Sequence, residues 1–293
     1  MSSDKVNANS GVQTPTTEAW RRLRSNRAAM TGLVLVLALI AVAAVGPWVS
    51  HYDYYEQNFA HADESPSAAH WFGTDELGRD QLTRVLYGAR ISLAVGIVAS
   101  LIALLIGVTY GGVSGYFGGN VDSVMMRIID LLYGIPLLLF VILLMVLLGT
   151  GLQNIFIALG AVYWLAMARI VRAQILSLKT RDYVQAARAL GAGHTRLILL
   201  HLLPNTMGPI IVTLTLSIPE AIFAEAFLSF IGLGVSAPKA SWGMLASDAL
   251  SGLQDYPLRL FFPAAAICLT MLAFNFLGDG LRDALDPKSE QAV

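Results

Sequence analysis

The chain has little of what soluble or disulfide-stapled domains carry. Only 13% of its 293 residues are charged, against about a quarter in soluble domains. Its one cysteine, Cys268, lies inside an apolar run, which excludes an internal disulfide. The formal net charge of -1 gives nucleic acid no reason to bind. These shortages disfavour a soluble domain and a nucleic-acid-binding one.

A phosphate-binding Gly-Lys-Ser/Thr loop is also missing. Only Lys179 and Lys288 precede a threonine or serine, and no glycine stands before either. The chain therefore supplies no ATPase site of this kind, and we expect it not to be an enzyme.

What the chain does have is apolar residues, 56% of the total, gathered in blocks. Several blocks approach the ~20 residues that a bilayer-spanning helix needs. The first could be a cleaved signal peptide, since Ala41 and Ala43 mimic a cleavage site. That block is too long and its leader too polar, so an uncleaved span is favoured. The sequence predicts an all-α integral membrane protein with six transmembrane helices, at about 28–49, 91–113, 128–148, 155–171, 207–230 and 260–277.

Basic residues predict the orientation of these spans, because loops on the cytoplasmic side are enriched in them. With the N-terminus inside, all but five of the 19 arginines and lysines fall on the inner side; the five are Arg79, Arg84, Arg90, Lys239 and Arg259. We therefore expect a multi-pass protein with both termini in the cytoplasm. The predicted segments are a cytoplasmic tail at 1–27, a first transmembrane helix at 28–50, an outer loop at 51–90, a five-helix core at 91–282 and a cytoplasmic tail at 283–293.

Within the core, the loop at 182–204 is unusually polar and broken by glycine. Asp182 and Gln185 have the spacing of a helix N-cap and its reciprocal partner. Gly191 and Gly193 offer left-handed caps that end the helix. The small apolar residues share one helical face, namely Tyr183, Ala186, Ala187 and Leu190.

A second short helix should run over 195–203 and end at Pro204, with Asn205 capping the fifth span. A helix of about eight residues is marginal by itself. Such a helix can be stabilised either by packing on its own bundle or by docking on a cytoplasmic partner, and its residues are compatible with both.

A family resemblance separates these two possibilities. Gln185-Ala186-Ala187, then Gly191, then Leu203-Pro204, resembles the Glu-Ala-Ala signature loop of ABC-importer membrane subunits, with Gln185 in place of glutamate and His201 at an apolar position. Four further stretches resemble the dipeptide/oligopeptide/nickel permeases, most closely the "C" type subunit: HWFGTDELGRD at 70–80, YGARISL at 87–93, YFGG at 116–119, and EAFLSFIGLG at 225–234 with WG at 242–243.

The resemblance implies a type I ABC-importer permease in the bacterial cytoplasmic (inner) membrane. Its partners would be the lipid bilayer, a second homologous permease, two cytoplasmic ABC ATPases and an extracellular binding protein that delivers short peptides. ATP and Mg²⁺ would bind the ATPases, and this chain would bind no cofactor. The ATPase-coupling residues would be Tyr183, Gln185, Ala186, Ala187, Arg188, Leu190, Gly191, Leu203 and Pro204.

The substrate remains open at this stage between dipeptides, oligopeptides, nickel and another small peptide-like solute. A stand-alone secondary transporter would need ion-coupling residues or inverted repeats with broken helices, and neither is seen.

Two acids lie in the fifth predicted span, Glu220 and Glu225. A mid-membrane charge is costly and usually faces a cavity or a partner. Five residues on a helix correspond to about 140° of rotation, so the two do not form one paired site. Both are candidates for the translocation path; the alternative for Glu220 is a structural helix contact, and for Glu225 a structural or gating role.

Three histidines share the outer loop with several carboxylates: His51, His61 and His70. Their spacings of ten and nine residues are not those of a compact metal motif. The charged residues between Thr74 and Asp80 are instead typical of a self-satisfied turn and a helix start. The sequence therefore predicts no metal site.

Overall fold

The computed structural model describes residues 15–235 and 238–286, and over these ranges every regular element is a helix. The parts of the two predicted tails at 1–14 and 287–293 lie outside the described residues. The elements are α1 Pro15–Ser25, α2 Arg27–Val49, η1 Phe59–His61, α3 Gln81–Phe117, α4 Gly119–Tyr133, α5 Leu137–Leu148, α6 Leu152–Leu178, α7 Asp182–Ala189, α8 His194–Arg196, η2 Leu197–Leu202, α9 Leu203–Phe230, α10 Trp242–Asp248 and α11 Leu258–Leu285.

Five helical segments of the described chain are long and apolar enough to cross a bilayer: α2, α3, α6, the continuous run 194–230, and α11. A sixth crossing exists if α4 and α5 count together, although the two helices meet at 85°. The prediction of an all-helical membrane fold is confirmed. The third predicted span is not one straight helix, because proline disfavours helix at the residue before it and Pro136 stands at the N-cap of α5.

The predicted start of the second span lies too far along the chain. α3 starts at Gln81, ten residues before the expected boundary, so 81–90 belong to a helix and not to the outer loop. The early start is set by Asp80, whose side chain accepts a hydrogen bond from the Thr83 backbone N–H. Such a cap satisfies one of the free N–H groups at a helix start. Polar residues that looked like loop therefore form the first turns of the helix.

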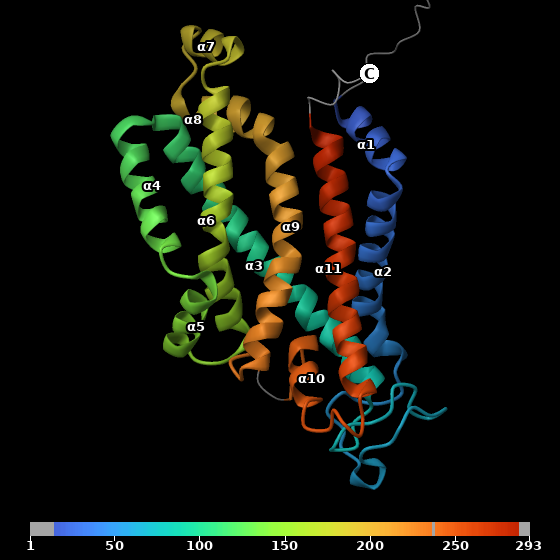
Figure 1. The fold of residues 1–293 in the computed structure, drawn as a ribbon. Helices are drawn as coiled ribbons and strands as arrows, with labels where there is room; N and C mark the ends of the chain where they lie inside the picture. The colour runs from blue at the N-terminus through green and yellow to red at the C-terminus, as the bar shows by residue number, and fades with distance from the viewer. Residues whose placement is uncertain (1–14, 236–237, 287–293) are drawn as a thin grey trace, which may run out of the picture.

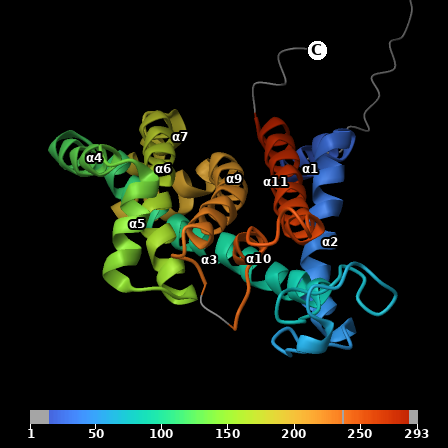
Figure 2. The ribbon, with the colours of Figure 1, turned by 60° about the horizontal axis from the view of Figure 1, so that its bottom comes forward.

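The helices are arranged so that α1, α7 and the C-terminal end of α11 lie at one end of the molecule (Figure 1). The segment 51–80, α10 and the junction of α5 with α6 lie at the opposite end. Figure 2 shows α2 and α11 on one side and α4 and α5 on the other, with α3 running diagonally across the bundle. Helix α3 is therefore the element that both halves share.

Close packing of α3 on α6 depends on glycines spaced four residues apart, Gly107, Gly111 and Gly115. A Cβ at Gly107 would stand 2.6 Å from the Met167 Cβ, and one at Gly115 would stand 2.9 Å from the Arg172 carbonyl oxygen. Small residues at this spacing let two membrane helices approach closely. The Gly107–Gly115 stripe thus fixes where α6, and with it α7, stands on the bundle.

Candidate functional site

The polar loop that the sequence singled out forms a short helix, α7, at the end of the molecule where α1 and the end of α11 also lie (Figure 1). It starts one residue earlier than predicted. The N-cap is Arg181, which makes no side-chain capping bond, and Asp182 is already in the first turn. The predicted pairing of Asp182 with Gln185 is therefore wrong; the Gln185 side-chain amide donates instead to the Lys179 carbonyl at 2.8 Å.

The end of α7 is set by Gly191, which has φ +83°. The Ala192 N–H donates to the Ala187 carbonyl, and the Gly191 N–H donates to the Arg188 carbonyl, both at 3.0 Å. This pair of bonds is a Schellman motif, in which a left-handed residue closes a helix. Gly193 does not share that conformation, since its φ is -69° and it serves as the N-cap of α8. Only Gly191 is a left-handed cap.

The two faces of α7 have different environments. Val184 is fully buried in a cluster with Leu197 and Leu202, and Ala187 is half-buried against the same cluster. Leu190 is 89% exposed and Tyr183 is 42% exposed; Gln185, Ala186 and Arg188 are exposed as well. Of the predicted apolar face, Ala187 therefore turns partly toward the chain's own core, while the rest points outward. Val184 therefore anchors α7 to the bundle, while Tyr183 and Leu190 leave an exposed apolar surface on its other side.

After α7 the chain does not form a separate short helix that ends at Pro204. It runs from His194 to Phe230 without a break, passing through a π-helical turn at Leu197–Leu202. The Leu203 N–H reaches back five residues to the Ile198 carbonyl, and this wide turn stands directly before Pro204, which has no N–H to donate. Asn205 does not cap a helix, because its side chain donates to the His201 carbonyl at 2.6 Å. Leu203 and Pro204 are therefore the first residues of α9.

A set of polar interactions beneath α7 was not predicted from the sequence. Asp122 of α4 accepts two charged hydrogen bonds from Arg172 of α6 and one from Ser114 of α3. The Lys179 ammonium donates to the Gly115 carbonyl at 2.9 Å. His194 Nδ1 lies 2.7 Å from the Tyr116 hydroxyl oxygen. These bonds link α3, α4 and α6 near α7 and hold the segments on either side of the short helix against the bundle.

Glu220 and Glu225 have opposite environments. Glu225 is fully buried and accepts from the Ser229 hydroxyl at 2.7 Å and from the Ser92 hydroxyl at 3.5 Å. The Ser92 oxygen also accepts from the Trp242 backbone N–H at 3.1 Å, so this node joins α3, α9 and α10. Glu220 is exposed on α9. The burial of Glu225 could not be read from its helical position, because the residues that enclose its carboxylate come from α3 and α10 as well as α9.

The predicted turn and helix start in the outer loop are present. The Asp75 carboxylate accepts from the backbone N–H groups of Leu77 and Arg79 and from the Arg79 side chain at 2.7 Å. It also binds the fully buried Arg84 of α3 at 2.5 Å. The loop is thereby held against the bundle.

Comparison with known proteins covers almost the whole chain. Residues 103–291 match the family described as binding-protein-dependent transport system inner membrane component, and residues 14–66 match the N-terminal TM domain of oligopeptide transport permease C. The chain is 58% identical over 274 residues to the dipeptide transport system permease protein DppC of Bacillus subtilis, covering 93% of this chain and 86% of that protein.

Other relatives and a solved structure agree with that match. The chain is 55% identical to the oligopeptide transport system permease protein OppC of Bacillus subtilis, over 92% of this chain and 89% of that protein. It is 43% identical to the glutathione transport system permease protein GsiD of Escherichia coli, over 94% and 92%. The MetNI methionine ABC transporter in an inward-facing conformation superposes with a TM-score of 0.54 at 16% identity, covering 70% of this chain and 96% of that one, which bears on the fold alone.

Proposed function

The chain belongs to the family of binding-protein-dependent transport system inner membrane components, and from this membership we propose that it is the permease subunit of an ATP-driven importer of short peptides. The 58% identity to a dipeptide permease and the 55% identity to an oligopeptide permease support that substrate class. The 43% identity to a glutathione permease supports a second candidate, another small peptide-like solute.

The energy for transport in such a system comes from other subunits. The chain is a transmembrane component without an ATPase domain, so ATP and Mg²⁺ would bind partner ATPases. A binding-protein-dependent system also implies a binding protein that delivers the substrate. We propose two cytoplasmic ATPases and a second homologous permease beside this chain.

The observation that carries the coupling proposal is the geometry of α7. Val184 is fully buried while Leu190 is 89% exposed. An eight-residue helix is too short to be stable alone. Here one face is packed on the bundle through Val184, and the opposite face exposes apolar side chains. Exposed apolar surface framed by polar residues is typical of a docking site. We assign Tyr183, Ala186 and Leu190 to direct contact with an ATPase groove, with Gln185 and Arg188 at its rim.

The coupling role of α7 also requires an orientation in the membrane. Both described ends of the chain and α7 lie at one end of the molecule (Figure 1), and the topology expected from the sequence puts all but five of the 19 basic residues on the cytoplasmic side. Basic loops stay in the cytoplasm, so α7 would face the cytoplasmic ATPases. The segment 51–80 and α10 would face the binding protein.

The translocation path would run along the exposed side of α9. Glu220 is exposed there, and the Tyr163 hydroxyl donates to its backbone carbonyl at 3.1 Å, joining α6 to α9 at that level. A carboxylate on this surface could receive the ammonium group of a peptide. Glu225 is fully enclosed, which supports a structural or gating role for it.

The test of coupling replaces Gly191 by valine. Because Gly191 has φ +83° and open space around it, a β-branched side chain is opposed only by the backbone conformation. We expect Gly191→Val to abolish substrate-stimulated ATPase activity and uptake in liposomes containing all subunits. Gly193→Val is the matched control, since Gly193 also has open space but an ordinary φ of -69°. Wild-type coupling in Gly191→Val, or equal loss in both variants, would refute the docking role of α7.

A further inference from the structure

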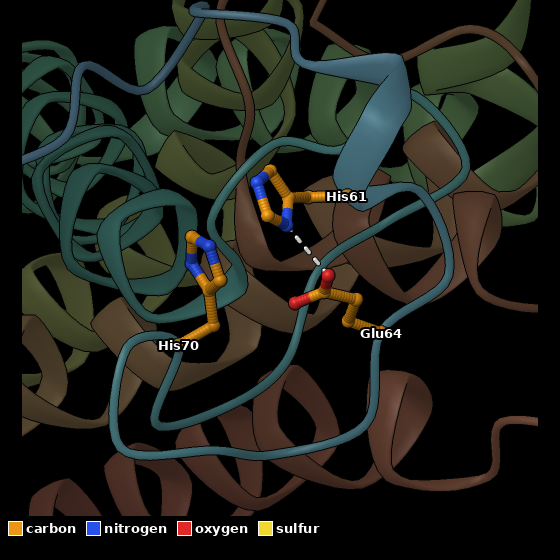
Figure 3. Close-up of side chains that lie close together, drawn as sticks. All are labelled: His61, Glu64 and His70. Atoms are coloured by element: carbon orange, nitrogen blue, oxygen red, sulfur yellow. Dashed lines mark hydrogen bonds and ion pairs between the residues drawn. The ribbon is translucent and has the colours of Figure 1, made fainter.

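The outer segment 51–80 brings together three side chains that are not adjacent in sequence. His61, Glu64 and His70 each offer a ligand atom, and these atoms all lie within 4.8 Å of one another. In Figure 3 the His61 ring faces Glu64, and the His70 ring lies beside them. His61 Nδ1 is 2.6 Å from Glu64 Oε1, and the two imidazole centroids are 6.0 Å apart. His51, which the sequence grouped with the other two, is not part of this cluster.

The backbone that carries His61 and Glu64 is tightly built. The buried Thr74 hydroxyl donates to the His61 carbonyl at 2.5 Å and accepts from the Glu64 N–H at 2.9 Å. Asp63, between the two, has φ +62°, a conformation that is uncommon for a residue other than glycine. Its carboxylate binds Arg259 of α11 at 2.5 Å. The turn that points His61 and Glu64 at each other is therefore pinned from two sides.

His70 is oriented by a second carboxylate. Its Nδ1 lies 2.9 Å from Asp80 Oδ1, and both side chains are buried. The other Asp80 oxygen accepts from the N–H and hydroxyl of Thr83, so the aspartate is fixed by the start of α3. A carboxylate on one ring nitrogen of a histidine directs the other nitrogen toward a metal. In His70 that other nitrogen is Nε2, which is left for a ligand.

We propose that His61, Glu64 and His70 form a binding site for a divalent transition-metal ion of the zinc class. Two imidazoles and one carboxylate suit Zn²⁺, and three protein ligands leave one position for water. Hard cations such as Ca²⁺ and Mg²⁺ prefer all-oxygen ligands and are disfavoured here. Ligand atoms around tetrahedral zinc are about 3.4 Å apart for bonds of ~2.1 Å, so small side-chain rotations from within 4.8 Å suffice.

Metal binding would close the outer segment on itself and on the helix bundle. It would tie η1, which ends at His61, to the His70 turn, and through Asp80 to the N-terminus of α3. All three ligands come from this chain, so metal binding requires neither the partner subunits nor the substrate.

The test uses the full-length chain purified in detergent with an affinity tag that contains no histidine, after removal of metal with EDTA. Isothermal titration with Zn²⁺ should show one ion per chain, and Co²⁺ should give the absorption bands of a low-coordinate site. Glu64→Gln and His61→Ala should each weaken Zn²⁺ binding at least tenfold, roughly the lower end of what even a supporting residue contributes. Both residues lie at the surface, so neither change should unfold the chain.

His51→Ala is the matched control, because His51 is an exposed histidine of the same outer segment outside the cluster. It should bind Zn²⁺ as the wild type does. Thermal unfolding without metal would establish that all variants are folded. The proposal is overturned if the wild type takes up no stoichiometric Zn²⁺, or if His61→Ala and Glu64→Gln bind as tightly as His51→Ala.

Discussion

At the scale of single residues, the two acids of α9 show how position in the fold separates groups that look alike in sequence. Both lie in an apolar helix, where an unpaired charge is costly. Glu225 is enclosed and hydrogen-bonded by serines, whereas Glu220 is exposed. Substitution should therefore affect stability at one position and transport at the other.

Replacing Glu225 by alanine should destabilise the chain, because the Ser229 and Ser92 hydroxyls would lose their shared acceptor. A buried polar group left without a partner costs about 1–3 kcal/mol. Glu225→Gln retains one acceptor oxygen and should lose less. Thermal unfolding in detergent checks both changes, and an unfolding midpoint unchanged in Glu225→Ala would contradict a structural role for this carboxylate.

Replacing Glu220 by glutamine should leave folding intact and weaken peptide uptake. If the carboxylate receives a peptide ammonium, losing the charge should raise the KM for uptake about tenfold, which corresponds to 1.4 kcal/mol. Uptake by the complete transporter in liposomes measures this, with Glu56→Gln as a control in an exposed loop acid. Equal KM values for Glu220→Gln and the wild type would remove Glu220 from the path.

At the scale of elements, the contact of α3 with α6 decides where α7 stands. A Cβ at Gly111 would press into the carbonyl oxygen of Ala168, which is backbone and cannot move aside. The next residue, Gly112, has only the Ile175 Cδ1 nearby, at 3.9 Å. Adjacent glycines of one helix therefore have different consequences.

Gly111→Ala should separate the two helices and lower the free energy of unfolding by about 1–3 kcal/mol, the usual cost of overpacking. Gly112→Ala should be neutral or slightly stabilising, because alanine favours helix and the space is open. Thermal unfolding of the two variants in one detergent compares them directly. Equal midpoints for both would mean that the Gly107–Gly115 stripe does not hold α6.

At the scale of the whole molecule, the polar segments are divided between two ends. One end carries α1, α7 and the C-terminal end of α11, and the other carries the segment 51–80 and α10 (Figures 1 and 2). If the basic end is cytoplasmic, reagents outside the cell should reach only the second end.

Single cysteines can test this orientation. In a Cys268→Ser background, Gln57→Cys should react with a membrane-impermeant maleimide in intact cells, because residue 57 is exposed in the outer segment. Ser25→Cys, exposed at the C-terminal end of α1 next to the start of α2, should react only after the membrane is permeabilised. The opposite labelling pattern would invert the proposed topology.

Sequence by itself determined the features that depend on short stretches of chain. Long apolar runs predict spanning helices wherever they occur, and five of the six expected spans lie within single continuous helical segments. The left-handed turn at Gly191 was also foreseen, because only glycine adopts it without strain. The family motifs, read in order, gave the transporter class that the relatives support.

The tertiary structure decided what depends on contacts between distant residues. It placed Asp80 at the start of α3, bent α4 against α5 and carried the helix through Pro204 by a π turn. It also enclosed Glu225 between serines of α3 and α9 and brought His61, Glu64 and His70 together. Burial and convergence are set by neighbours far away in the chain, and helical period and residue spacing carry no information about those neighbours.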